Sequence, residues 1–109
     1  MKDLASLVRQ AQKMQADMKQ AEERLEAAEV TGEAGAGLVQ ITVNGKGAVK
    51  AVSIDPSLAK PEEVEVLEDL LLAALNDAKR KADEVSQETM KEAAGDLASM
   101  LPPGFKPPF

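Results

Sequence analysis

The feature that most constrains the fold of this chain is a repeat of apolar residues along its N-terminal part. The repeat advances alternately by three and four residues, through Leu4, Leu7, Ala11, Met14, Met18, Ala21, Leu25 and Ala28. A mean spacing of about 3.5 residues is typical of a coiled-coil seam. No glycine or proline interrupts residues 1–31, and Asp3 suits the N-cap. We therefore predict a helix over residues 3–29, which is too long for this chain to cover by itself, so that part of it projects or meets a partner.

The next segment, residues 30–55, has the features of a small antiparallel sheet. Residues 30–34 predict a short first strand, and the second has alternating apolar residues on one face: Val39, Ile41 and Val43. The sequence NGKG at 44–47 indicates a hairpin. The third strand, AVKAVSI, is ended by Asp-Pro. Three strands form a stable sheet only when a helix or a second subunit covers one face.

A second helix is predicted over residues 61–95. Pro61 suits the first turn, and the glutamates that follow it are favourable at a helix N-terminus. The leucine-rich stretch 67–75 is apolar around most of the helix, which predicts burial from more than one side. Residues 102–109 form a Pro-rich tail that is incompatible with a helix.

The predicted fold class is therefore α+β, with the order α-β-β-β-α. A small three-stranded antiparallel sheet is flanked by two long projecting helices, and residues 1–101 make a single domain. Such a sheet has open edges, and the helices are too long to be buried within one chain. Both features predict a homodimer.

Composition excludes most enzymatic and cofactor chemistry. The chain has no histidine and no cysteine, which removes thiolate nucleophiles, the imidazole base and the usual zinc ligands. Its glycines match neither G-x-G-x-x-G nor a P-loop, and adjacent carboxylates on a helix do not converge. We expect no enzymatic activity, no cofactor, no metal site and no small-molecule substrate.

The hydropathy of the chain predicts a protein of the cytoplasm that does not enter a membrane. The longest apolar run, residues 70–75, is far shorter than the roughly 20 residues of a membrane helix. The N-terminus shows no signal-peptide apolar region.

The net charge of −6 hides an uneven distribution: residues 1–20 hold four basic and two acidic side chains, whereas residues 61–101 hold four basic and eleven acidic ones. With Leu4 at heptad position a, the cations of the first helix lie opposite the apolar seam: Lys2, Arg9, Lys13 and Lys19. That outward face has cations and amides only for about 27 Å of helix, until Glu23. It therefore suits a phosphate backbone.

A second basic cluster lies in the second helix: Lys79, Arg80 and Lys81. These residues are further candidates for contact with DNA. Acidic residues occur four positions away from each of them, at Asp83, Glu84 and Asp77 respectively. Ion pairing along the helix is thus the leading alternative for this cluster.

Three separated blocks of the sequence resemble the YbaB/EbfC family of bacterial nucleoid-associated proteins: VTGEAGAGLVQITVNGKGAVKAVSIDPSL, LEDLLLAALNDAKRKADE and LPPGF. The resemblance covers essentially the whole chain. It implies an α-β-β-β-α subunit, a homodimer joined through the sheet region, paired helices that project as tweezers, and binding to double-stranded DNA. The matching blocks carry turns and core residues, so the cations of the DNA-binding site are inferred from the helices.

Taken together, these patterns predict a nucleoid-associated protein that binds double-stranded DNA as a homodimer with low sequence specificity. It would alter DNA conformation and influence nucleoid organisation and gene expression. Only two aromatic residues occur, Phe105 and Phe109, which disfavours single-stranded nucleic acid. The alternative is a chaperone-like or adaptor protein whose paired helical arms clamp other proteins.

Overall fold

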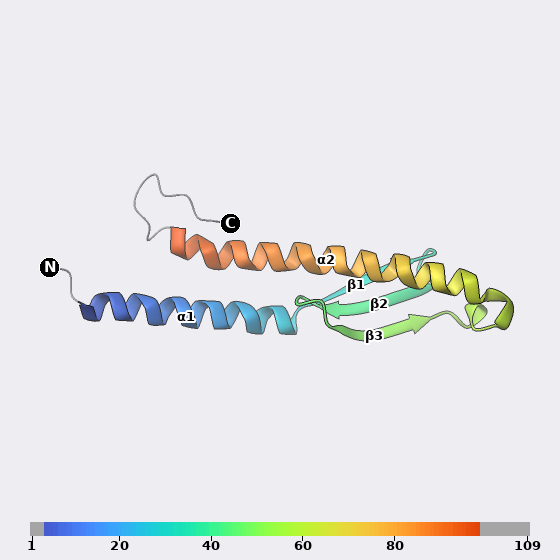
Figure 1. The fold of residues 1–109 in the computed structure, drawn as a ribbon, viewed down its shortest axis with the longest axis horizontal. Coiled ribbons are helices and arrows are strands. Elements are labelled where there is room, and N and C mark those ends of the chain that lie inside the picture. The colour runs from blue at the N-terminus through green and yellow to red at the C-terminus, as the bar shows by residue number, and fades with distance from the viewer. Residues whose placement is uncertain (1–3, 99–109) are drawn as a thin grey trace.

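The computed structural model describes the backbone of residues 4–98 and the side chains of residues 4–93. Its helices and strands follow one another as α1 (Leu4–Ala27), β1 (Glu29–Ala34), β2 (Val39–Asn44), β3 (Val49–Ile54) and α2 (Val64–Ala98). Two short 3-10 turns, Pro56–Leu58 and Pro61–Glu63, join β3 to α2. The α-β-β-β-α order predicted from the sequence is confirmed (Figure 1).

The three strands form one antiparallel sheet in the order β1-β2-β3. Its register places Ile41 of β2 opposite Gly32 of β1 and opposite Val52 of β3. The register of β2 and β3 shifts after Thr42, which leaves Lys50 without a partner, as in a β-bulge.

The core lies between one face of the sheet and α2. The alternating residues of β2 predicted to share a face are buried there, against small residues of α2: Val39, Ile41, Val43, Ala74, Ala78 and Ala82. Gly32 lies so close to α2 that a Cβ atom would be 2.2 Å from the Ala78 nitrogen. A glycine facing alanines lets the helix rest directly on the strand.

The NGKG hairpin is fixed by its own side chain and by α1. The Asn44 side chain is buried, and its Oδ1 accepts hydrogen bonds from the Lys46 and Ala48 N–H groups, each at 3.0 Å. The Gly45 N–H donates to the Leu25 carbonyl at 2.8 Å. The hairpin therefore packs against the C-terminal end of α1 and sets the direction of that helix.

The two helices run side by side in opposite directions, so that α1 and the second half of α2 extend well beyond the sheet (Figure 1). The molecule measures 74 × 25 × 15 Å, with a radius of gyration of 20.4 Å. A compact domain near this size has a radius of gyration of about 13 Å. Only Ala21 and Leu25 of α1 are buried, and Leu4 near its start is 74% exposed. The first helix projects, as its length predicted.

Two details of α2 differ from the sequence-based expectations. The segment Pro61–Glu63 is a 3-10 turn, and the α-helix that follows continues through Gly95 to Ala98. A glycine costs about 1 kcal/mol inside a helix but does not by itself end one. Leu72, which was expected to be buried, is 62% exposed in the single chain, whereas its neighbours Leu71 and Leu75 are half-buried. The Pro-rich tail, residues 102–109, lies outside the described residues.

Candidate nucleic-acid interface

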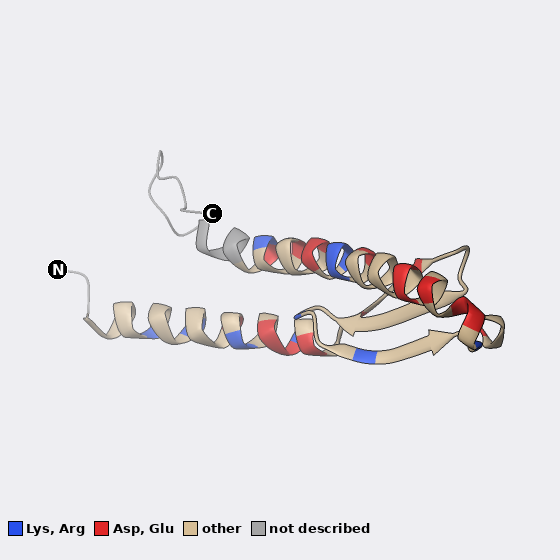
Figure 2. Cartoon of the chain, turned by 45° about the vertical axis from the view of Figure 1, so that its right-hand side comes forward, with Lys and Arg blue, Asp and Glu red and all other residues tan. Residues whose placement is uncertain are grey.

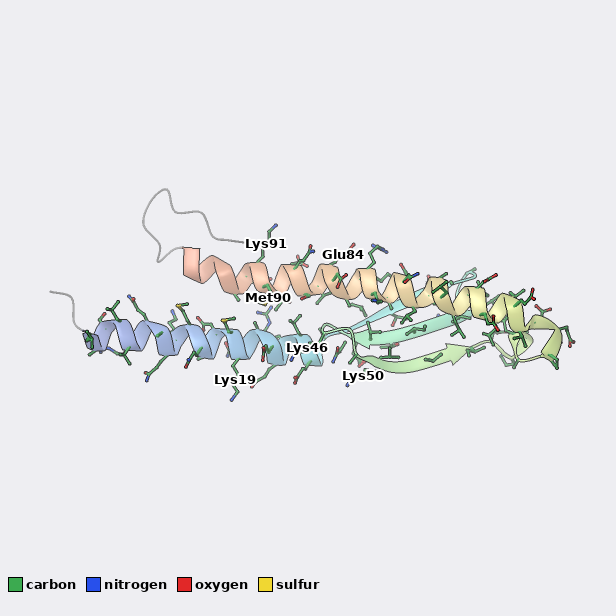
Figure 3. The ribbon with its side chains drawn as sticks, in the orientation of Figure 1. Lys19, Lys46, Lys50, Glu84, Met90 and Lys91 are labelled. Carbon is green, nitrogen blue, oxygen red and sulfur yellow. The ribbon has the colours of Figure 1, made fainter. Side chains whose placement is uncertain are left out.

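The cations of the first helix lie on its solvent-facing side. Arg9, Lys13 and Lys19 are all exposed. Figure 3 shows Lys19 extending away from α2, whereas Glu84 and Lys91 of α2 extend away from α1. Lys2, the fourth predicted cation, lies outside the described residues. We refer to Arg9, Lys13 and Lys19 as the α1 cations.

Acidic side chains of α2 do not neutralise these cations. The ion pairs within residues 4–93 use other basic residues: Arg24, Lys46, Arg80 and Lys81. Between the two helices there is one such pair in this part of the chain, from Arg24 to Glu92 at 2.6 Å. The guanidinium and ammonium groups of the α1 cations therefore face solvent, where an anionic partner can reach them.

The acidic residues of α1 are concentrated near its C-terminal end. Asp17 is half-buried and lines a pocket between the two helices together with Gln20, Ala21, Arg24, Glu92 and Ala93. The remaining acids, at 22, 23 and 26, lie in the last turns, next to the sheet (Figure 2). The surface suited to a polyanion is thus limited to the projecting part of α1, residues 4–20.

The second basic cluster is engaged in pairs within the chain. The Arg80 guanidinium donates to Asp77 at 2.9 Å and to Glu84 at 2.8 Å, and these acids raise the pKa of Arg80. Lys81 bonds the Asp77 carboxylate at 3.1 Å. The i,i+4 pairing considered from the sequence is therefore present for Arg80 and Lys81. Lys79 is exposed and forms no ion pair within the described part of the chain.

Asp77 and Lys81 also satisfy backbone groups at the outer edge of β1. The Glu33 N–H donates to Asp77 Oδ2 at 3.0 Å, and Lys81 Nζ donates to the Thr31 carbonyl at 2.8 Å. The Glu33 N–H, followed by Arg80 and Lys81, lowers the pKa of Asp77 from 3.8 to about 2. These two side chains fasten the edge strand to α2, a role that a separation of more than 40 residues conceals in the sequence.

The structure adds cations that sequence analysis did not single out. Lys50 occupies the β-bulge of β3 and is exposed, and Figure 3 shows it extending toward the same side of the molecule as Lys19. Lys46 at the hairpin pairs with Glu26 at 3.1 Å. Acidic residues of the last turns of α1 separate this group from the α1 cations, so the two do not form one continuous basic surface.

No group of three or more acidic side chains within the described residues is arranged to hold a metal ion. Neither helix, over the part that the structure describes, combines the length and the apolarity that crossing a bilayer requires.

Comparisons with known proteins give one consistent result. The model of the YbaB/EbfC DNA-binding family matches residues 1–97. A nucleoid-associated protein of Maricaulis maris is 53% identical over the full length of both chains. One of Rhodospirillum rubrum is 47% identical, again over both full lengths. The crystal structure of an uncharacterized protein from Helicobacter pylori superposes with a TM-score of 0.67 at 28% identity, covering 90% of this chain and 99% of the other.

Proposed function

The chain belongs to the YbaB/EbfC DNA-binding family, and on that premise we propose that it is a nucleoid-associated protein that binds double-stranded DNA as a homodimer with low sequence specificity. The projecting part of α1 is the surface that meets DNA. Its contact would alter DNA conformation and thereby influence nucleoid organisation and gene expression.

The observation that carries this proposal is the placement of the α1 cations. Arg9, Lys13 and Lys19 are exposed and take no part in the ion pairs of the described residues, on a helix whose acids lie elsewhere. The overall charge of −6 would repel DNA from the rest of the molecule. Binding should therefore depend on these few phosphate contacts.

Phosphate contacts of this kind position a protein on DNA without reading its sequence. Residues 4–98 contain no aromatic side chain that would wedge between bases. We therefore expect low specificity and a steep dependence on salt, with the logarithm of the affinity falling by about 0.9 per phosphate contact for each tenfold rise in salt.

The proposed homodimer rests on the uncovered side of β3. Val49, Val52 and Ile54 are 53%, 52% and 38% exposed. Val52 and Ile54 are the register partners of buried residues of β2, so they lie on the core face of the sheet. α2 covers this face over β1 and β2 and leaves β3 uncovered. A second copy that completes this core would double the number of arms presented to DNA.

The test is a charge-reversed variant in which Arg9, Lys13 and Lys19 are all replaced by Glu. We expect it to lose binding to a random-sequence duplex in a gel-shift assay at low salt. The matched control replaces Lys50, Lys60 and Lys91 by Glu, which makes the same change in net charge at exposed positions away from the α1 cations. Equal affinity of the two variants, both folded by circular dichroism, would show that the surface is wrongly placed.

One observation favours a second candidate, a chaperone-like adaptor that clamps other proteins: the apolar seam of α1 is exposed at Leu4 and Leu7. A salt titration of binding to partner candidates separates the two functions. Contact through phosphates weakens steeply as salt rises, whereas contact through an apolar seam responds little.

A further inference from the structure

The N-terminal half of α1 has an apolar seam that no other part of the described chain covers. We call its residues the arm seam: Leu4, Leu7, Ala11, Met14 and Met18. Leu4, Leu7 and Met18 are 74%, 56% and 48% exposed, and Val8 beside them is 49% exposed. α2 contacts α1 nearer the sheet, where Ala21 and Leu25 are buried. The exposed half keeps the same 3.5-residue period, which is the period of a helix that packs against a second helix.

We propose that the arm seam pairs with the arm seam of a second copy of this chain, as a short antiparallel coiled coil. In an antiparallel pair, residues at heptad position a face residues at d of the partner. A two-fold axis between positions 12 and 13 then sets Leu7 opposite Met18 and Ala11 opposite Met14. Each layer combines the two subunits' side chains, and the central layers set a small residue against a large one, which is how facing positions interdigitate.

The flanks of the arm seam favour this occupant over a charged partner. In the same register Val8 faces Gln15, and Gln10 faces Asp17, so no two like charges oppose one another across the interface. The α1 cations lie away from these flanks at heptad positions f, c and b. Pairing through the seam therefore leaves them facing solvent, on opposite sides of the two-helix unit. Two copies joined in this way would present cations to two separate duplexes.

Disulfide formation between two single-cysteine variants tests both the pairing and its direction. The chain contains no cysteine, so an introduced thiol has no competitor. The Ala11→Cys chain is mixed with the Met14→Cys chain and oxidised, and mixed disulfide dimers are quantified on a non-reducing gel. The matched control is Ala16→Cys, mixed and oxidised in the same way, because Ala16 lies on the exposed side opposite the seam.

We expect the Ala11→Cys and Met14→Cys mixture to form on the order of tenfold more disulfide than the control, because cysteines whose Cα atoms lie more than about 7 Å apart cannot be bridged. Adding Leu7→Gln to both chains should reduce the product by about tenfold, through loss of a buried leucine.

A mixture that forms no more disulfide than Ala16→Cys would overturn the proposal and leave the seam to another protein or to the chain's own tail. Equal or greater linkage of Ala11→Cys with itself would indicate parallel pairing, which also overturns it. Because the assay contains no DNA and reports only on the arms, its outcome is independent of whether the protein binds DNA or forms a dimer through β3.

Discussion

Two glycines of this chain are required by close approach of another element. Gly32 lies beneath α2, and a Cβ atom there would be 2.2 Å and 2.3 Å from backbone atoms of Ala78 and Ala74. At Gly45 a Cβ atom would lie 2.8 Å from the Leu25 carbonyl oxygen. Gly47 differs from both, because its φ of +88° requires glycine while nothing lies within 4 Å of it.

Replacement of Gly32 by Ala should therefore be more damaging than replacement of Gly47 by Ala. The first change forces α2 away from the sheet, and we expect it to lower the free energy of unfolding by about 3 kcal/mol, as overpacking in a core does. The second strains one exposed turn and should cost about 1 kcal/mol. Urea unfolding followed by circular dichroism measures both, and equal losses would contradict the close packing of β1 against α2.

Asp77 predicts how stability responds to acid. Its pKa is lowered from 3.8 to about 2 in the folded chain, so the folded state binds fewer protons than the unfolded state between these values. Its stabilising contribution is complete above about pH 4 and is lost as the pH falls to about 2. Asp55, whose pKa is lowered by the Ser57 hydroxyl and N–H, acts in the same direction.

We expect Asp77→Asn to lower the melting temperature at pH 6 and to reduce the further decrease between pH 5 and pH 2. The amide lacks the charge that Arg80, Lys81 and the Glu33 N–H stabilise. Melting curves at the two acidic pH values provide the measurement. An unchanged acid dependence in the variant would mean that other carboxylates, Asp55 among them, determine it.

At the scale of the element, α1 and α2 use their charges differently. The α1 cations have no acid partner within residues 4–93, whereas Arg80 and Lys81 are paired along α2 and with β1. A paired cation must give up its carboxylate before it can contact a phosphate. The two helices therefore differ in the affinity that each cation can contribute.

Single neutral substitutions compare the helices directly. Arg9→Gln should weaken binding to duplex DNA and lower the slope of log affinity against log salt by about 0.9, the value for one lost phosphate contact. Arg80→Gln should leave the slope unchanged within error. Fluorescence anisotropy at several salt concentrations gives both slopes. An Arg80→Gln slope that falls as much as that of Arg9→Gln would assign the second cluster to the DNA surface.

At the scale of the whole molecule, the shape of one chain is incomplete. The sheet has a core face that α2 covers over β1 and β2 and leaves uncovered over β3, and Leu72 of α2 is exposed as well. Apolar residues that continue a core onto the surface favour an obligate partner. A second copy is the partner that we propose.

Val52→Glu should convert the protein to single chains without unfolding it. The side chain is 52% exposed in one subunit, so the charge remains solvated there but would be buried at the proposed interface. Ser53→Glu is the matched control, because the adjacent residue points to the opposite face of the sheet. Light scattering after size exclusion gives the mass of each. A mass of two chains for Val52→Glu would place the dimer interface elsewhere.

The sequence by itself determined the order of the elements, the buried face of β2 and the outward placement of the cations on α1. These properties follow from local periodicity: a period of 2 assigns alternate residues of a strand to one face, and a period near 3.5 separates the two sides of a helix. The same local rule identified the acids that pair with Arg80 and Lys81, because their partners lie four residues away or fewer.

Only the tertiary structure decided which of these surfaces are occupied. The docking of Gly45 on α1, the contact of Gly32 with α2 and the bonds from Asp77 and Lys81 to β1 all join residues far apart in the chain. Such contacts depend on where α2 crosses the sheet, which no local period specifies. That crossing leaves β3 and the first half of α1 exposed, because one helix is too narrow to cover three strands and a second helix at once.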